Sequence, residues 1–290
     1  MTEINVVLVE KLIRTQFPQW AEHPIAPVDN GGWDNRTFRL GDSMSIRLPS
    51  ALCYVAQVEK EHRWLPVLRP QLPLPIPIPI GLGAPGAGYP WAWSIYGWLD
   101  GKPAHADRIR DFSRFAVDLA HFLVASRGID AHNGPVAGVH NFHRGGSLAV
   151  YDTEARQSID MLANEIDVAA VTEVWNTALA TSWQGPPAWV HGDVAAGNLL
   201  VNDGRLCAVI DFGCAGVGDP SSDLVIAWTF LDRANRKKFR SAIALDPETW
   251  NRARGWAIWK ALITLAHCRD TSPAKASEAR QTIRNILDDR

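Results

Sequence analysis

The sequence predicts an α+β protein with two lobes, a small lobe of mainly antiparallel strands and a larger, mainly helical lobe. Two observations support this prediction. Short strand-like runs separated by turn residues occupy much of the chain up to residue 97. Beyond residue 101 the apolar residues recur at helical spacing, as in residues 111–126. The chain has 290 residues, which is enough for two lobes with real cores.

The small lobe should begin with a helix over residues 6–17, where apolar residues follow a helical period. We then expect a helix at 55–68 and strands at 25–28, 37–40, 43–48 and 91–96. Residues 70–99 carry no charge, but alternating prolines exclude a membrane-spanning helix there and favour an extended edge segment.

The large lobe should contain mostly helices, with Thr153 and Asp167 as possible N-caps of two of them. The expected helices cover residues 111–126, 153–166, 167–181, 221–231, 235–245, 247–269 and 273–287. Residues 98–101 separate the strand-like part from the helical part, and they resemble the linker between the lobes of a known two-lobed family. We therefore divide the chain into residues 1–97, 98–101 and 102–290.

Composition narrows the class of protein. The formal net charge is −2 and no basic stripe is present, so we expect no nucleic-acid partner. The four cysteines form no Cys-x-x-Cys pair, which fits a reducing cytoplasm. The N-terminus lacks a basic segment and a cleavage site, so we expect no signal peptide and no membrane association. Both a monomer and a homodimer are compatible with the sequence.

One predicted hairpin organises the large lobe. Apolar runs at residues 199–201 and 206–210 flank a turn containing Asp-Gly, which is a strong hairpin signal. Asp193 and Asn198 precede the first strand and Asp211 follows the second, so the hairpin should bring all three to one edge. Their oxygens suit Mg²⁺ carrying the phosphates of a nucleotide, and a carboxylate free of metal can accept a proton from a hydroxyl.

The stretch around this hairpin resembles the catalytic centre of the aminoglycoside phosphotransferase family, which is similar in fold to protein kinases. The resemblance is carried by His191-Gly192-Asp193, by Asn198, by Ile210-Asp211-Phe212-Gly213 and by Gly218-Asp219-Pro220-Ser221-Ser222-Asp223-Leu224. It implies a bilobal protein-kinase-like fold and transfer of the γ-phosphoryl group of Mg-ATP or Mg-GTP to a small-molecule hydroxyl. An aminoglycoside-type antibiotic is the expected acceptor, with antibiotic resistance as the role.

The resemblance also implies a role for each matching residue at this centre. Asp193 would accept or orient the acceptor hydroxyl, and Asn198 and Asp211 would bind Mg²⁺. His191 and Asp219 would be structural. Asp223 could be structural or could face the acceptor.

On the nucleotide side, Arg47 stands where the family expects a cation for the α- and β-phosphates, usually lysine. Its helix partner would be Glu61, with Glu59 as the alternative, because only one of the two can face inward. The glycine-containing turn at residues 29–36 would cover the phosphates. The other implied nucleotide contacts are Tyr96 at the back of the pocket, the Gly97 carbonyl, the Leu99 amide and Ile210.

Two kinds of acceptor wall are compatible with the sequence. Acids concentrated at residues 152–173, among them Glu165 and Asp167, could attract a polycation, although a solvated helix face explains them equally well. A neutral or weakly basic acceptor would instead use tryptophans as apolar walls, the candidates being Trp228, Trp256 and Trp259.

Two rival functions remain open. A metabolic kinase for an amino alcohol, sugar or nucleoside, or a macrolide kinase, would have the same catalytic stretch. A nucleotide-binding pseudokinase that acts through a partner belongs to a different class. The intact Asp193, Asn198 and Asp211 argue against it, whereas arginine at position 47 leaves it some room.

Overall fold

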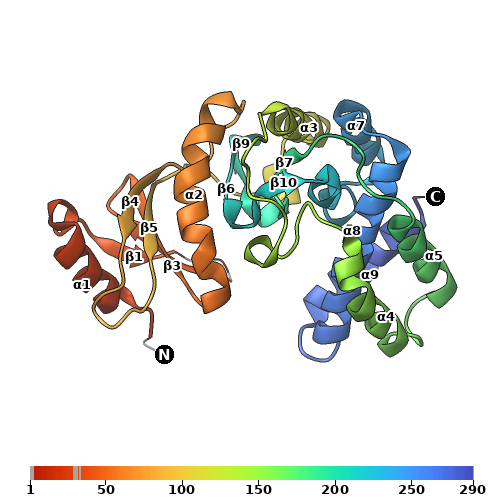
Figure 1. Ribbon diagram of the computed structural model, residues 1–290, viewed down its shortest axis with the longest axis horizontal. Coiled ribbons are helices and arrows are strands. Elements are labelled where there is room, and N and C mark those ends of the chain that lie inside the picture. Colours follow the sequence, from red (N-terminus) through yellow and green to blue (C-terminus); the bar gives the residue numbers. More distant parts are fainter. Residues whose placement is uncertain (1–2, 29–31, 33, 290) are drawn as a thin grey trace.

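The computed structural model describes residues 3–28, 32 and 34–289, and it confirms the α+β class. The strands of the N-terminal part gather at one end of an elongated molecule, and most of the helices lie at the other end (Figure 1). The chain was expected to divide at residues 98–101, and this division remains our proposal. None of the described helices combines the length and apolar character needed to span a membrane.

The small lobe is built on a five-stranded antiparallel sheet with the order β1-β2-β3-β5-β4. Its strands are β1 (Ile25–Pro27), β2 (Asn35–Leu40), β3 (Met44–Pro49), β4 (Pro79–Gly83) and β5 (Trp93–Gly97). The proline-rich segment leads into β4, which is an edge strand as its composition predicts.

Two helices complete the small lobe. Helix α1 (Val6–Gln16) is capped by Asn5 and buries its apolar face in a cluster with Ile46, Trp93 and Ile95 of the sheet. Helix α2 (Val55–Leu68) lies between the sheet and the large lobe (Figure 1). Because α2 touches both parts, it can couple a residue of β3 to the catalytic hairpin.

The large lobe packs its helices around α8 (Pro247–Cys268), which contacts α4, α5 and α9. The other helices are α3 (Phe112–Gly128), α4 (Asp152–Met161), α5 (Val168–Leu179), α6 (Ile226–Thr229), α7 (Arg233–Ile243) and α9 (Pro273–Leu287). One continuous apolar cluster joins these helices to the C-terminal half of α2 and to the hairpin. The frame that carries the site is therefore a single packed body.

Two small sheets hold the site within this lobe. The first has the order β6-β8-β9, formed by β6 (Lys102–Pro103), β8 (Leu199–Asn202) and β9 (Arg205–Val209). The second pairs β7 (Ala188–Val190) with β10 (Gly216–Gly218). The strands flank the loops that contain the predicted catalytic residues, so both ends of each loop are fixed by backbone hydrogen bonds.

Two predictions about helices were wrong. The helix expected at 221–231 is a 3₁₀ segment, Pro220–Leu224, followed by the short α6. Asp219 caps this segment by accepting a hydrogen bond from the Ser221 N–H, and the Asp223 carboxylate within it accepts the N–H groups of His191 and Gly192. Thr153 is not an N-cap, because a 3₁₀ turn continues directly into α4 at Asp152. Asp167 does cap α5, accepting a hydrogen bond from the Ala170 N–H at 3.0 Å.

Candidate active site

The β8–β9 hairpin brings the predicted metal ligands to one end, as the Asp-Gly turn predicts. Asp203 and Gly204 both have positive φ, 49° and 78°, which is the geometry of a tight type I′ turn. At the open end the Ile210 N–H donates to the Asn198 carbonyl at 2.9 Å. That bond places Asn198 directly beside the residue that precedes Asp211, so the two side chains emerge together.

Asp193 stands at the centre of the site with both carboxylate oxygens occupied. The Asn198 amide donates to its Oδ2 at 3.1 Å and to its backbone carbonyl at 2.9 Å. The Lys260 ammonium of α8 lies 2.9 Å from its Oδ1. Burial alone would raise the pKa of the Asp193 carboxyl, but the Lys260 charge brings it below its ordinary value. Asp193 is thus held ionised.

Asp211 adopts a left-handed conformation, with φ 67°, that turns its carboxylate toward the small lobe. Its Oδ1 accepts a hydrogen bond from Arg47 Nη2 of β3 at 2.6 Å. Arg47 Nη1 also lies 3.5 Å from Glu61 of α2, and the Tyr96 hydroxyl donates to Glu61 Oε2 at 2.5 Å. Glu61 is buried whereas Glu59 is exposed, so Glu61 is the partner of the pair expected from the sequence.

The pKa of Arg47 reflects this arrangement. Burial disfavours its charge, but Asp211 and Glu61 together raise the pKa above the ordinary value. Arg47 of the small-lobe sheet is therefore always charged, and it contacts both Glu61 of α2 and Asp211 at the end of the hairpin. The guanidinium is thus fixed in place by two carboxylates.

His191 and Asp223 fix the loop that carries Asp193. The His191 ring is 2 % exposed, its Nε2–H faces the Ile210 carbonyl at 2.9 Å, and its Nδ1 accepts from the Asp193 N–H at 3.2 Å. The buried Asp223 carboxylate accepts the N–H groups of His191 and Gly192 at 2.8 and 2.7 Å. With both oxygens turned to the backbone, Asp223 does not face an acceptor, which favours its structural alternative.

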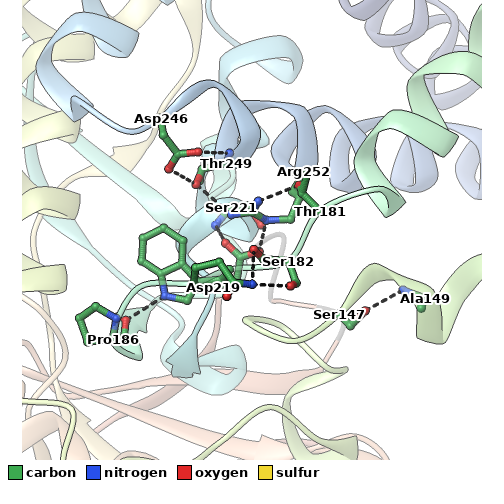
Figure 2. Close-up of polar contacts among 12 residues, drawn as sticks. Ser147, Ala149, Thr181, Ser182, Pro186, Asp219, Ser221, Asp246, Thr249 and Arg252 are labelled. Carbon is green, nitrogen blue, oxygen red and sulfur yellow. Dashed lines mark hydrogen bonds and ion pairs between the residues drawn. The ribbon is translucent and has the colours of Figure 1, made fainter.

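Asp219 ties the following loop to α8. Its carboxylate accepts from the Ser221 N–H at 3.0 Å and from Arg252 Nε at 2.7 Å. Figure 2 shows Arg252 between Asp219, Thr181 and Thr249, and each of these contacts is a hydrogen bond. Since α8 also carries Lys260, the network fixes the helix that approaches Asp193.

The donor set fits a magnesium ion that arrives with a nucleotide. Among residues 3–28, 32 and 34–289, no cluster of three His, Cys, Asp or Glu side chains could hold a metal alone. The Asn198 amide oxygen has no hydrogen-bond partner in that part of the chain, and Asp211 uses only Oδ1. One carboxylate and one amide oxygen, completed by phosphates and water, are a usual Mg²⁺ environment.

The linker residues expected to contact a purine have few backbone partners in the described part of the chain. The Gly97 N–H donates to the Ile78 carbonyl at 2.9 Å, and the Trp98 N–H donates to the Ser43 carbonyl at 2.7 Å. The Leu99 N–H has no acceptor among the described residues. The expected phosphate-covering turn includes residues 29–31 and 33, which lie outside the described residues.

Glu165 and Asp167, the two acids named for a possible acidic wall, have partners of their own. Glu165 is ion-paired with Arg280 at 2.6 Å and with Arg269 at 3.5 Å, and Asp167 is used as the cap of α5. Helices α4 and α5 lie toward the end of the molecule away from the small lobe (Figure 1). Neither carboxylate is free to attract a polycation to Asp193.

The tryptophans expected at the acceptor wall separate into two groups. Trp228 is 1 % exposed and packs against Trp250, with its Nε1–H on Asp289, so it belongs to the core. Trp256 and Trp259 lie beside Lys260 on α8, and their ring centroids are 5.7 Å apart. Both are also buried, at 1 % and 5 % exposed, and the Arg144 guanidinium lies over their rings, so any part they have in the wall is beneath Arg144.

Sequence reasoning missed two cations at the site. Lys260 contacts Asp193, and the Arg144 guanidinium carbon lies 4.8 and 5.0 Å from the rings of Trp256 and Trp259. The charge of Arg144 also acts on Asp193. The available signal was Lys260 as the single charged residue of residues 255–266, next to Trp256-Ala-Ile-Trp259.

Most of the chain, including the site, is similar to a known protein family. Residues 26–259 match the model of the "phosphotransferase enzyme family". An aminoglycoside 3′-phosphotransferase of Escherichia coli is 39 % identical over 46 residues, which are 16 % of this chain and 17 % of that protein. The matched stretch thus spans less than a fifth of that relative's length.

Solved structures show the same fold at low sequence identity. The GDP and kanamycin complex of APH(2″)-IIIa aligns with a TM-score of 0.76 at 18 % identity, covering 97 % of this chain and 99 % of that one. A macrolide 2′-phosphotransferase from Brachybacterium faecium aligns at 0.61 with 22 % identity, covering 94 % and 98 %. Kinase-like phosphotransferases therefore share the whole architecture of this chain.

Proposed function

The chain belongs to the phosphotransferase enzyme family, and on that premise we propose that it transfers the γ-phosphoryl group of a Mg-nucleotide to a hydroxyl of a small molecule. The observation that carries the proposal is the meeting of Asp193, Asn198 and Asp211 at one end of the hairpin, with Arg47 opposite. The nucleotide complexes among the similar structures support ATP or GTP as the donor.

Each group has a task in this proposal. Arg47 binds the α- and β-phosphates and exchanges part of its contact with Asp211 for them, while Glu61 keeps its orientation. Asn198 and Asp211 would hold Mg²⁺, which neutralises charge on the phosphates when bound. Asp193 orients the acceptor hydroxyl and takes its proton late, because phosphoryl transfer depends mostly on positioning and charge.

Several acceptor classes fit the reaction. The names of similar proteins favour an aminoglycoside or a macrolide, and an amino alcohol, sugar or nucleoside would belong to a metabolic kinase. A screen of these classes with radiolabelled ATP and GTP tests the proposal. Transfer to at least one acceptor, absent without Mg²⁺ and absent in Asp193→Asn, is the expected result.

The pseudokinase alternative makes a different prediction. A pseudokinase would bind nucleotide without hydrolysing it, whereas the proposed enzyme should show slow Mg²⁺-dependent hydrolysis when no acceptor is present. Nucleotide binding with neither hydrolysis nor transfer to any tested acceptor would favour the pseudokinase. We also propose a cytoplasmic site of action, which the four free cysteines support. The proposed assembly is a monomer or a homodimer.

A further inference from the structure

Arg144 is a cation held in place without an anionic partner. Its guanidinium lies over the rings of Trp256 and Trp259, at 4.8 and 5.0 Å from their centroids. Within the described part of the chain it forms no ion pair and no side-chain hydrogen bond, and its Nε is buried. Stacking on aromatic rings orients a guanidinium, but it leaves the five N–H donors unsatisfied.

The platform beneath Arg144 is rigid. Tyr151 stacks on Trp259 with ring centroids 4.0 Å apart, and its hydroxyl donates to the Phe142 carbonyl at 2.9 Å. The Trp259 Nε1–H donates to Glu154 at 2.7 Å, so that nearby acid is already engaged. A preorganised, unpaired arginine on such a platform has the properties of a recognition residue for a carboxylate or phosphate.

Arg144 lies against the loop that carries Asp193. A Cβ added at Gly192 would come within 3.0 Å of the Arg144 Cβ, and the Arg144 charge is among those that lower the pKa of Asp193. Lys260, one turn beyond Trp256 on α8, contacts Asp193 directly. Two cations therefore flank the carboxylate that would receive the acceptor.

Glu154 is an acid beside this platform, but its contact is with the Trp259 Nε1–H, and among the described residues it forms no ion pair with Arg144. Asp193 balances Lys260, and Asp211 faces Arg47 on the nucleotide side. Burial raises the pKa of the neighbouring Cys214 thiol to about 12, so that group is neutral. Arg144 is therefore the cation on this side of the described site that no carboxylate contacts, and its guanidinium is open to an anion.

We propose that the acceptor carries an anionic group, a carboxylate or a phosphate, near the hydroxyl that is phosphorylated, and that Arg144 binds this group with help from Lys260. The inference rests on the proposed function for the role of Asp193. The acceptor would then be a hydroxy acid or a phosphorylated alcohol, in place of the polycationic amino sugar expected from the resemblance.

The test compares four three-carbon probes that differ mainly in charge: glycerate, glycerol phosphate, glycerol and aminopropanediol. Binding is followed by tryptophan fluorescence, because Arg144 lies on two tryptophan rings, in chloride buffer free of phosphate and sulfate. MgADP is titrated first and kept saturating, so that the probes cannot occupy the donor site. If MgADP does not bind, the proposed function fails, and the four probes are then compared without it.

The expected result is that at least one anionic probe binds about ten-fold or more tightly than glycerol and aminopropanediol. Arg144→Gln should remove that preference, and Arg144→Lys should keep part of it through its charge. The relative affinity of glycerate and glycerol phosphate then distinguishes a carboxylate site from a phosphate site.

Arg240→Gln is the matched control, because Arg240 also lies over a tryptophan of α8, Trp250, at 5.1 Å. Trp250 is ten residues from Lys260, which is about 15 Å along a helix. Equal binding of the four probes, no saturable response to either anion, or a preference that survives Arg144→Gln would overturn the proposal. A loss of MgADP affinity in Arg144→Gln as large as its loss of anion affinity would assign Arg144 to the donor and overturn it too.

Discussion

Replacing Arg47 tests the link between the small lobe and the catalytic hairpin. Arg47→Ala removes the cation from between Asp211, at 2.6 Å, and Glu61, at 3.5 Å. Glu61 is 5 % exposed, so it would become a buried carboxylate without a cation. Breaking a fully buried pair costs about 3–5 kcal/mol, but Asp211 is 26 % exposed and water recovers part of this. We expect a loss of about 2–3 kcal/mol in the free energy of unfolding.

The same substitution should weaken nucleotide binding. One charge-assisted contact to phosphate contributes about 1.5–3 kcal/mol, so the Kd of the Mg-nucleotide should rise roughly 10- to 100-fold. Arg47→Lys keeps a point charge but cannot reach both carboxylates with a planar fork, so its Kd and its stability should fall between those of wild type and Arg47→Ala.

A double variant separates the two effects. In Arg47→Ala/Glu61→Gln the buried negative charge is gone, and glutamine can still accept the Tyr96 hydroxyl. Stability should therefore recover relative to Arg47→Ala, whereas nucleotide affinity should not. Calorimetric titration gives the Kd and urea denaturation gives the stability. Arg114→Ala, at a surface pair that is 60 % exposed on the arginine, is the control with a small expected effect. Nucleotide affinity within two-fold of wild type in Arg47→Ala would refute the phosphate role.

Further predictions concern four other residues. Asp193→Asn should lower transfer by roughly 100-fold or more while nucleotide Kd stays near wild type, as measured by turnover and titration. Lys260→Gln should raise the pKa of Asp193, because burial then acts without the ammonium, and should move the acidic limb of the pH–rate profile to higher pH. Burial lowers the pKa of Lys60 to about 8, so unfolding takes up a proton above that pH and stability rises from pH 8 to roughly 10. Lys60→Met should flatten this rise in urea denaturation. Gly192→Ala should cost about 1–3 kcal/mol in the same assay, because φ is +82° and the new Cβ would lie 2.3 Å from the Cys214 carbonyl oxygen.

Local signals were enough to predict the centre of the site. The Asp203-Gly204 turn predicts the hairpin, and this placed Asn198 and Asp211 at one end before any tertiary contact was known, whereas the bulge between Leu200 and Val201 that shifts the pairing was not predicted. Helix geometry shows that only one of Glu59 and Glu61 can face Arg47, but it does not show which one does. Only packing against the sheet decided which of them is buried.

Residues that reach the site from distant elements could not be predicted in this way. Lys260 is 67 positions from Asp193 along the chain, and its contact depends on how α8 packs against the hairpin frame. A count of acids likewise could not show that Glu165 is already paired with two arginines or that Asp167 caps a helix. The number of charged residues in a segment predicts the electrostatic field near it only when the partner of each charge is known.

The contacts of Asp193 also bear on which class of acceptor can bind. Lys260 occupies Oδ1 and Asn198 occupies Oδ2, so an incoming hydroxyl must share or displace one of them. Asn198 is held by a second bond to the Asp193 carbonyl, whereas the Lys260 side chain is 43 % exposed on a flexible stem. Lys260 is therefore the partner that moves. An ammonium displaced in this way needs a new anion, and an acceptor with its own carboxylate or phosphate would supply one where a polycation would not.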